Sequence, residues 1–403
     1  MTGAAVTGTQ HGADASAVAP ATATTAPARW IGLDALRGLA IASMILVNNP
    51  GDNHVYAPLE HAAWHGCTFT DLVFPTFLFV AGASIVPSLG GALARGRKPA
   101  ELWPRVLRRA ATLVLLGLFV QSFPLVTFAE GKRLFEPLLA VRFPGVLQRI
   151  GVCYGAAALL FLFTSERSQR RALLGCLLLY WPLLALCPTP DGGAPDLATH
   201  GDHLAGWLDR TVFGSHIYKA SRGGVYDPEG LLSTIPAVAT ALLGTIAGRV
   251  LARSGALATD RVKSLLLLGA GWTALGTVWG WLFPINKALW TSSYALFTAG
   301  IAATALGLCV YLFEERPYAR FARPLVVYGR NALLVFVGSA LLGRTLGMIT
   351  VGDGVPVSHW FFVHALANWS DPYVASLLYA LLWVSGWYAV LAWLYRRGVV
   401  WKL

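Results

Sequence analysis

Apolar residues fill most of this 403-residue chain in long runs, which short polar and basic segments separate. A helix needs about 20 mostly apolar residues to cross the hydrocarbon core of a bilayer. The pattern therefore predicts an all-α, polytopic integral membrane bundle of about ten transmembrane helices. The predicted spans cover residues 31–48, 68–92, 106–123, 144–164, 171–187, 230–250, 262–284, 290–313, 323–345 and 371–395.

Basic residues predict the orientation of the chain, because cytoplasmic loops carry an excess of Lys and Arg. On the opposite side, segments 49–67 and 346–370 contain neither residue. Both termini are therefore predicted to be cytoplasmic, and the long segment 188–229 to be external. The basic segments are alternate ones along the chain: 93–109, 165–171, 249–263, 314–323 and the C-terminal end.

Composition supports the membrane assignment and limits the kinds of binding partner that the protein can have. Hydrophobic residues make up 56% of the chain and charged residues 13%, whereas soluble domains carry about 25% charged residues. The net charge of +11 lies in short clusters between apolar runs. This placement favours a lipid bilayer as partner and argues against nucleic acid. The five cysteines show neither metal-ligand spacing nor a disulfide framework.

The first 28 residues differ from the rest. They are rich in Ala, Thr, Gly and Ser, are nearly uncharged and lack the apolar core of a signal peptide. Residues 1–28 are predicted to be a disordered tail, and residues 29–403 a single transmembrane domain.

Polar groups inside apolar runs are costly in a bilayer, so they are expected to be paired or functional. Asp34 and Arg37 are three residues apart and share a helix face. They form either a structural salt bridge near the cytoplasmic surface or part of a phosphate site. Arg149 lies one or two turns inside its run and requires a carboxylate, phosphate or carbonyl partner.

Candidate acid–base groups gather at the external ends of the first two predicted helices. Asn48 ends the first helix, and His54, His61 and His65 follow within a short segment. A neutral imidazole can accept a proton or an acyl group near pH 7, but spacing does not choose among the three. His61 and His65 are four apart, as in metal pairs, yet no further ligand cluster is near. Asp71 either joins this site or only begins its helix.

Two other polar groups lie at opposite ends of the predicted bundle. Arg330 and Asn331 precede the ninth span on its cytoplasmic side. Asp227 and Glu229 lie at the external mouth of the sixth span, where they either bind a ligand or cap the helix.

These segments together resemble the heparan-alpha-glucosaminide N-acetyltransferase family and its bacterial relatives. The most specific block is 61–75, which reads His-x-x-Trp, then Gly and Thr, then Asp-Leu-Val-Phe-Pro. The block at 33–38 is weaker, because another large family of membrane O-acyltransferases also opens with it. The matching segments are 33–38, 47–48, 61–68, 71–79, 144–149, 227–234 and 329–331.

The resemblance implies transfer of an acetyl group from cytosolic acetyl-CoA, a cosubstrate, to a glucosamine amine on the external side. The family's essential histidine matches His61, and its active-site asparagine matches Asn48. His61 acts as a general base or is itself acetylated, and Asp71 orients an imidazole or an acceptor hydroxyl. No metal is expected. Residues expected near the donor are Arg37, Arg149, Arg330 and Asn331, and those near the acceptor are Trp64, Asp227 and Glu229.

The resemblance also implies a bacterial inner-membrane location and is compatible with a homodimer. The additional luminal domain and leading span of the animal enzyme are not expected here. The amino-sugar or glycan acceptor stays open.

Three alternatives to this function remain. An O-acyltransferase acting on a surface glycan would share segment 33–38 but not segment 61–75. An amino-sugar transporter would take up its substrate without dependence on CoA. A membrane scaffold would lose only stability on the change His61→Ala.

Overall fold

The computed structural model describes residues 30–127, 133–198, 200, 203–219, 225–253, 257–316 and 318–401. The predicted tail, residues 1–28, lies outside these ranges. From Ile31 onward the described chain forms one unit.

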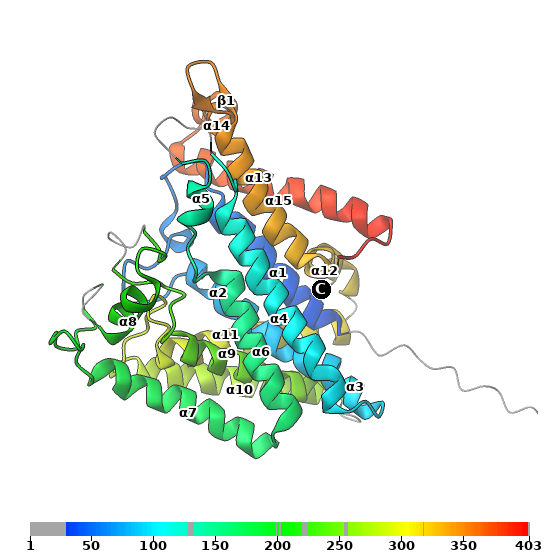
Figure 1. Ribbon diagram of the computed structural model, residues 1–403. Helices are drawn as coiled ribbons and strands as arrows, with labels where there is room; N and C mark the ends of the chain where they lie inside the picture. The colour runs from blue at the N-terminus through cyan, green and yellow to red at the C-terminus, as the bar shows by residue number, and fades with distance from the viewer. Residues whose placement is uncertain are drawn as a thin grey trace, which may run out of the picture. The chain divides into compact units, whose positions relative to one another are not determined.

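Long helices build the fold (Figure 1), which confirms the all-α prediction. Within the described ranges, each of the ten predicted spans coincides with a helix of at least 17 residues. These helices are α1 (Ile31–Asn48), α2 (Phe69–Ile85), α4 (Pro99–Ser122), α6 (Val146–Phe163), α7 (Glu166–Ala185), α9 (Thr234–Leu251), α10 (Ala258–Trp279), α11 (Ser292–Val310), α13 (Ala332–Met348) and α15 (Pro372–Arg396).

Short elements extend or connect the long helices. The strands β1 (Thr350–Val351) and β2 (Val355–Pro356) form a two-stranded antiparallel hairpin, in which Thr350 pairs with Pro356. The short helices are η1 (Ala57–Leu59), η2 (Val86–Gly90), α3 (Gly91–Ala94), α5 (Glu136–Leu139), α8 (Leu204–Phe213), η3 (Tyr311–Glu315), η4 (Ala319–Ala322), α12 (Arg323–Arg330), α14 (Val357–Phe362) and η5 (Val363–Ala367).

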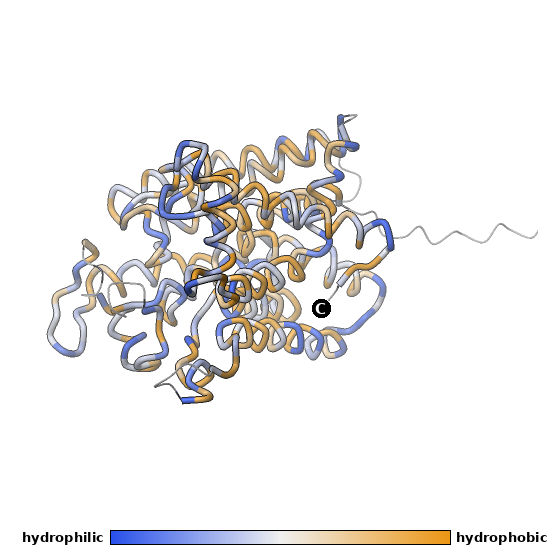
Figure 2. The backbone as a smooth tube through the Cα atoms, turned by 90° about the horizontal axis from the view of Figure 1, so that it is seen from above, coloured by the Kyte–Doolittle hydropathy of each residue, from blue (hydrophilic) through white to orange (hydrophobic). Residues whose placement is uncertain are grey.

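Seven of the described helical segments are long and apolar enough to cross a membrane. An eighth is obtained if η4 and α12 are counted with α13 as one span, bent by 64° next to Asn331. The remaining two long helices, α4 and α7, carry clustered arginines within their first three turns. Figure 2 shows the helical segments mostly in hydrophobic colours, with hydrophilic residues concentrated at turns and ends.

Helix α1 lies inside the bundle and packs against α2, α11, α12 and α15. The pairs α2–α9, α4–α6 and α10–α11 add the other extensive contacts. Small residues allow α2 and α9 to approach closely. A Cβ atom added to Gly82 would lie 1.9 Å from the carbonyl oxygen of Ala241, and one added to Gly244 would lie 2.1 Å from that of Phe79. Close backbone contact of this kind is a main source of helix association in lipid.

The change Gly244→Ala should therefore lower the thermal stability of the detergent-purified protein. A methyl group at this contact must push α2 and α9 apart, and overpacking costs about 1–3 kcal/mol. A Cβ atom added to Gly271, on α10, would meet no described atom within 4 Å, so Gly271→Ala is the matched control. Thermal unfolding monitored by tryptophan fluorescence measures both. Equal melting temperatures for the two variants would contradict the proposed packing constraint.

Candidate active site

A short hydrogen bond joins His61 to Asp71 at the start of α2. Nδ1 of His61 lies 2.6 Å from Oδ1 of Asp71, whose side chain is only 1% exposed. Oδ2 of Asp71 accepts hydrogen bonds from the backbone N–H groups of Ala62, at 3.0 Å, and Thr68, at 3.1 Å. The single proton of the Thr68 hydroxyl is shared between Oδ2, at 3.1 Å, and the carbonyl oxygen of Glu60, at 2.5 Å. The loop that contains His61 is therefore tied to the first turn of α2.

These contacts fix the chemical state of the pair. Asp71 accepts every one of them, as an ionised carboxylate does. Nδ1 of His61 therefore carries a proton, so that in the neutral ring Nε2 has the lone pair. With its side chain 56% exposed, His61 can present Nε2 to a reactant as a base or a nucleophile.

A cavity of about 350 Å³ lies in front of this pair. Asn48, at the end of α1, and Trp64, from the His61 loop, line the cavity together with His61, Asp71 and Glu229. The structure thus brings all three predicted catalytic residues and two of the three predicted acceptor residues to one cavity. Its volume is within the range of small-molecule sites.

Aromatic side chains form part of the cavity wall. Trp64, Tyr218 and Tyr226 all line it. The Trp64 indole N–H donates to the carbonyl oxygen of Leu197 at 2.7 Å, and its ring lies 4.2 Å from the His200 ring. Trp64 is therefore held in place by the segment before α8. Such flat surfaces suit the apolar face of a sugar ring.

Lys287, in the loop between α10 and α11, also lines the cavity, and the sequence did not single it out. Its Nζ lies 3.0 Å from Nδ1 and 3.2 Å from Nε2 of His61, and 3.5 Å from Oδ1 of Asp71. Burial lowers the pKa of Lys287, while the negative charges of Asp71 and Glu229 oppose this shift. The available sequence signal was a lone lysine in a short loop on the cation-poor side of the predicted topology.

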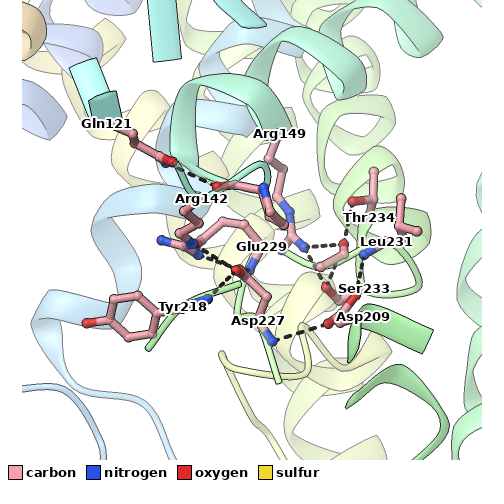
Figure 3. Close-up of polar contacts among 12 residues, drawn as sticks. Gln121, Arg142, Arg149, Asp209, Tyr218, Asp227, Glu229, Leu231, Ser233 and Thr234 are labelled. Carbon is pink, nitrogen blue, oxygen red and sulfur yellow. Dashed lines mark hydrogen bonds and ion pairs between the residues drawn. The ribbon is translucent and has the colours of Figure 1, made fainter. Parts of the chain in front are cut away.

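Figure 3 shows an ion cluster beside the cavity, in which Arg142 lies between Asp227 and Glu229. Nε of Arg142 donates to Oδ2 of Asp227 at 2.7 Å, and Nη2 donates to both carboxylates. Asp227 also accepts the backbone N–H groups of Tyr218 and Glu229, each at 2.9 Å. The hydrogen bonds of Asp227 therefore stabilise the segment before α9, whereas Glu229 lines the cavity. Although burial acts in the opposite direction, Arg142 holds the pKa of Glu229 below its ordinary value.

Arg149 extends from α6 to the start of α9 (Figure 3). Its Nη2 donates to the carbonyl oxygen of Gly230 at 2.9 Å and to the Ser233 hydroxyl at 2.5 Å. The expectation of a carbonyl partner is confirmed. Nε and Nη1 of Arg149 are buried without a hydrogen-bond partner among the described residues, and the guanidinium lies 5.1 Å from the Trp290 ring. This arginine therefore holds the chain next to the cavity residue Glu229 without lining the cavity itself.

The other residues expected near the donor lie at the opposite end of α1. Arg37 donates to Asp34 at 2.9 Å, which confirms the predicted pair, and to Ser84 at 2.7 Å. Arg330 ends α12 with its guanidinium 4.8 Å from the Tyr395 ring. The segments of α1 and α12 that carry these two arginines pack backbone to backbone. The structure thus groups Arg37 with Arg330 and separates both from Arg149.

Asn331, next to Arg330, is engaged by the C-terminal segment. Its Oδ1 accepts the backbone N–H of Trp401 at 2.8 Å, and its Nδ2 donates to the carbonyl oxygen of Val399 at 3.4 Å. These contacts position the chain after α15 against the bend between α12 and α13.

The two other candidate histidines have separate surroundings. His54 lies 2.8 Å from Oδ2 of Asp52 and outside the cavity lining. His65 lies 3.3 Å from Nδ2 of Asn286. Across the described ranges, no three His, Cys, Asp or Glu side chains are grouped so that they could hold a metal ion.

The apolar helical bundle, with a buried carboxylate paired to an exposed imidazole, indicates an integral membrane protein with an acid–base site. Residues 29–199 match the family model described as heparan-alpha-glucosaminide N-acetyltransferase, catalytic. The chain is 31% identical to the heparan-alpha-glucosaminide N-acetyltransferase of Homo sapiens and 30% identical to that of Mus musculus. Each match covers 77% of this chain and 53% of the relative, so the chain spans about half the length of these curated relatives. Over these lengths the chain is similar to the heparan-alpha-glucosaminide N-acetyltransferase family.

Asp209 gives the site a measurable dependence on pH. It lies under the Asp227 loop, where Oδ1 accepts the Leu231 N–H at 2.9 Å and Oδ2 accepts the Asp227 N–H at 3.2 Å. Burial raises the pKa of Asp209 from 3.8 to about 7, against the effect of these two hydrogen bonds. Because the pKa of Asp209 is raised in the folded state, protonation of this carboxyl stabilises the fold. This stabilisation is complete below about pH 4 and is lost as the pH rises through about 7.

The change Asp209→Asn should remove this titration. The melting temperature of the wild type, relative to that of Asp209→Asn, should fall between pH 5 and pH 7, corresponding to about 1–3 kcal/mol. Asp353→Asn, in the exposed turn between β1 and β2, should leave the pH profile unchanged. Parallel profiles for wild type and Asp209→Asn would show that Asp209 titrates normally.

Proposed function

We propose that this protein is a membrane acetyltransferase that moves an acetyl group from acetyl-CoA to the amine of a glucosamine-like sugar. The observation that carries the proposal is the His61–Asp71 pair at the wall of the cavity. Similarity to curated relatives that are named N-acetyltransferases supports the chemistry.

The residues of the cavity account for the steps of this reaction. Asp71 holds the His61 ring with Nε2 free, so that Nε2 takes the proton of the attacking amine. In a second route Nε2 itself attacks the thioester, the C–S bond breaks and CoA leaves as a thiolate. The acetyl-imidazole then transfers its acetyl group to the amine, which gives up a proton to the thiolate. Asn48 supplies an amide that can hydrogen-bond the acyl carbonyl or an acceptor hydroxyl. Glu229 supplies a carboxylate, and Trp64 a flat surface, for the sugar.

The donor is proposed to enter from the cytosol with its phosphates at the Arg37 end of α1. Nε of Arg330 is buried without a hydrogen-bond partner among the described residues, so this guanidinium retains donor capacity for an anion. Arg37 adds a second cation on the neighbouring helix. Guanidinium groups bind phosphate oxygens with well-matched geometry. Asn48 lies eleven residues further along α1, roughly 16 Å at 1.5 Å per residue.

We also propose ten spans, cytoplasmic termini and a location in a bacterial inner membrane. α4 and α7 complete the count of ten if the arginines within their first three turns lie at the cytoplasmic surface. Basic residues flank membrane helices on that side. This topology would place His61 outside, opposite the entry of the donor.

The first test is release of CoA by the detergent-purified protein with acetyl-CoA and glucosamine. The wild type should release CoA only when the amino sugar is present. His61→Ala should reduce the rate by at least ~10²-fold, because loss of a positioned general base removes about that much.

His54→Ala is the matched control, because His54 belongs to the same loop but lies outside the cavity. It should retain the wild-type rate. If the folded wild type binds the sugar but releases no CoA, the acetyltransferase proposal is wrong and an amino-sugar transporter becomes the better explanation.

A further inference from the structure

Lys287 projects from a turn that the surrounding residues hold rigidly. Oδ1 of the buried Asn286 accepts the Leu289 N–H at 2.9 Å, and the Asn286 N–H donates to the Thr291 hydroxyl at 3.1 Å. The Trp290 N–H donates to the carbonyl oxygen of Lys287 at 3.0 Å, and Trp290 has a φ of 49° and is fully buried. The base of the Lys287 side chain is therefore fixed, with its four-carbon stem directed at the cavity.

The ammonium group of Lys287 does not block the base. A single atom at nearly equal distances from both ring nitrogens of His61 cannot lie along the lone-pair direction of either. The contact is therefore electrostatic, and Nε2 stays available. Lys287 forms its ion pair with Asp71 at 3.5 Å, which leaves N–H groups of the ammonium directed elsewhere. With its side chain 21% exposed and lining the cavity, Lys287 can reach a ligand that lies beside His61.

We propose that Lys287 is a further catalytic residue, whose ammonium group hydrogen-bonds the carbonyl oxygen of the thioester. This role rests on the proposed acetyltransferase function. The amine nitrogen bonds to the carbonyl carbon while Nε2 of His61 takes the amine proton. Negative charge then collects on the carbonyl oxygen beside Lys287. The C–S bond breaks, the carbonyl re-forms, and CoA leaves as a thiolate that takes the proton from His61.

The positions of the neighbouring charges favour this role over that of a nucleophile. Burial lowers the pKa of Lys287, but the Asp71 carboxylate 3.5 Å away and the charge of Glu229 oppose this effect and favour the protonated amine. An ammonium group has no lone pair with which to attack. A cation placed beforehand where charge develops is among the strongest contributions to catalysis. Lys287 and Asn48 both line the cavity, so the amide supplies a second donor from α1.

Kinetics of the full chain test the proposal. Lys287→Met removes the charge while keeping an unbranched apolar stem, and it should lower kcat for CoA release by about 10²–10³-fold, as the loss of one such donor does. The KM for glucosamine should change by less than about 3-fold, and Lys287→Arg should recover part of kcat. Lys263→Met, at an exposed lysine at the start of α10, is the charge-matched control and should retain the wild-type kcat.

A binding measurement separates this role from a structural one. S-acetonyl-CoA carries a ketone, whereas S-propyl-CoA has a methylene group in its place. The wild type should bind the ketone at least ~10-fold more tightly, as a hydrogen bond from a charged donor predicts, and Lys287→Met should lose this preference while still folding. Full activity in Lys287→Met, or acetylated Lys287 in quenched reactions analysed by mass spectrometry, would overturn the proposal. An inactive wild type would instead count against the acetyltransferase function itself.

Discussion

The carboxylate of Asp71 is the constraint on which the cavity depends. It accepts hydrogen bonds from the His61 ring, from the backbone N–H of Ala62 in the His61 loop, and from Thr68 at the start of α2. Its backbone carbonyl accepts the Tyr294 hydroxyl of α11 at 2.5 Å, and its side chain pairs with Lys287. One residue therefore joins α2, α11, the His61 loop and the Lys287 turn. A buried carboxylate with fewer partners would be costly to desolvate, so the cavity wall is held as a unit.

Local sequence patterns predicted the long helices and the pairs that lie within one helix. The Asp34–Arg37 pair follows from three-residue spacing, and the ten apolar runs coincide with ten long helices. The Arg142–Asp227 and Lys287–His61 contacts join residues 85 and 226 positions apart. No local pattern encodes such pairings, because they arise only when the helices pack. For the same reason spacing did not choose among the three histidines, whereas the structure gives His61 alone a buried carboxylate in the cavity.

Helix α1 separates two kinds of chemistry. Its first turns carry Arg37 beside the Arg330 end of α12, and its last residue, Asn48, lines the cavity. An anion would be bound at the first end, where a guanidinium group retains donor capacity. A polar but uncharged reacting group would be bound at the other end of α1, beside Asn48. The rigidity of a packed helix fixes the separation, so a ligand that contacts both ends must be long and must carry its charge at one end.

The charges on the cavity wall support this division. Among the lining residues, Arg142 and Lys287 are opposed by Asp71 and Glu229, so with His61 neutral the wall has no net charge. Such a wall would not attract the phosphates of a donor, which agrees with placing them at the Arg37 end. An amine that enters uncharged is already nucleophilic, and its remaining proton then needs a base only as the bond forms. His61, with Nδ1 held by Asp71 and Nε2 free, meets that requirement.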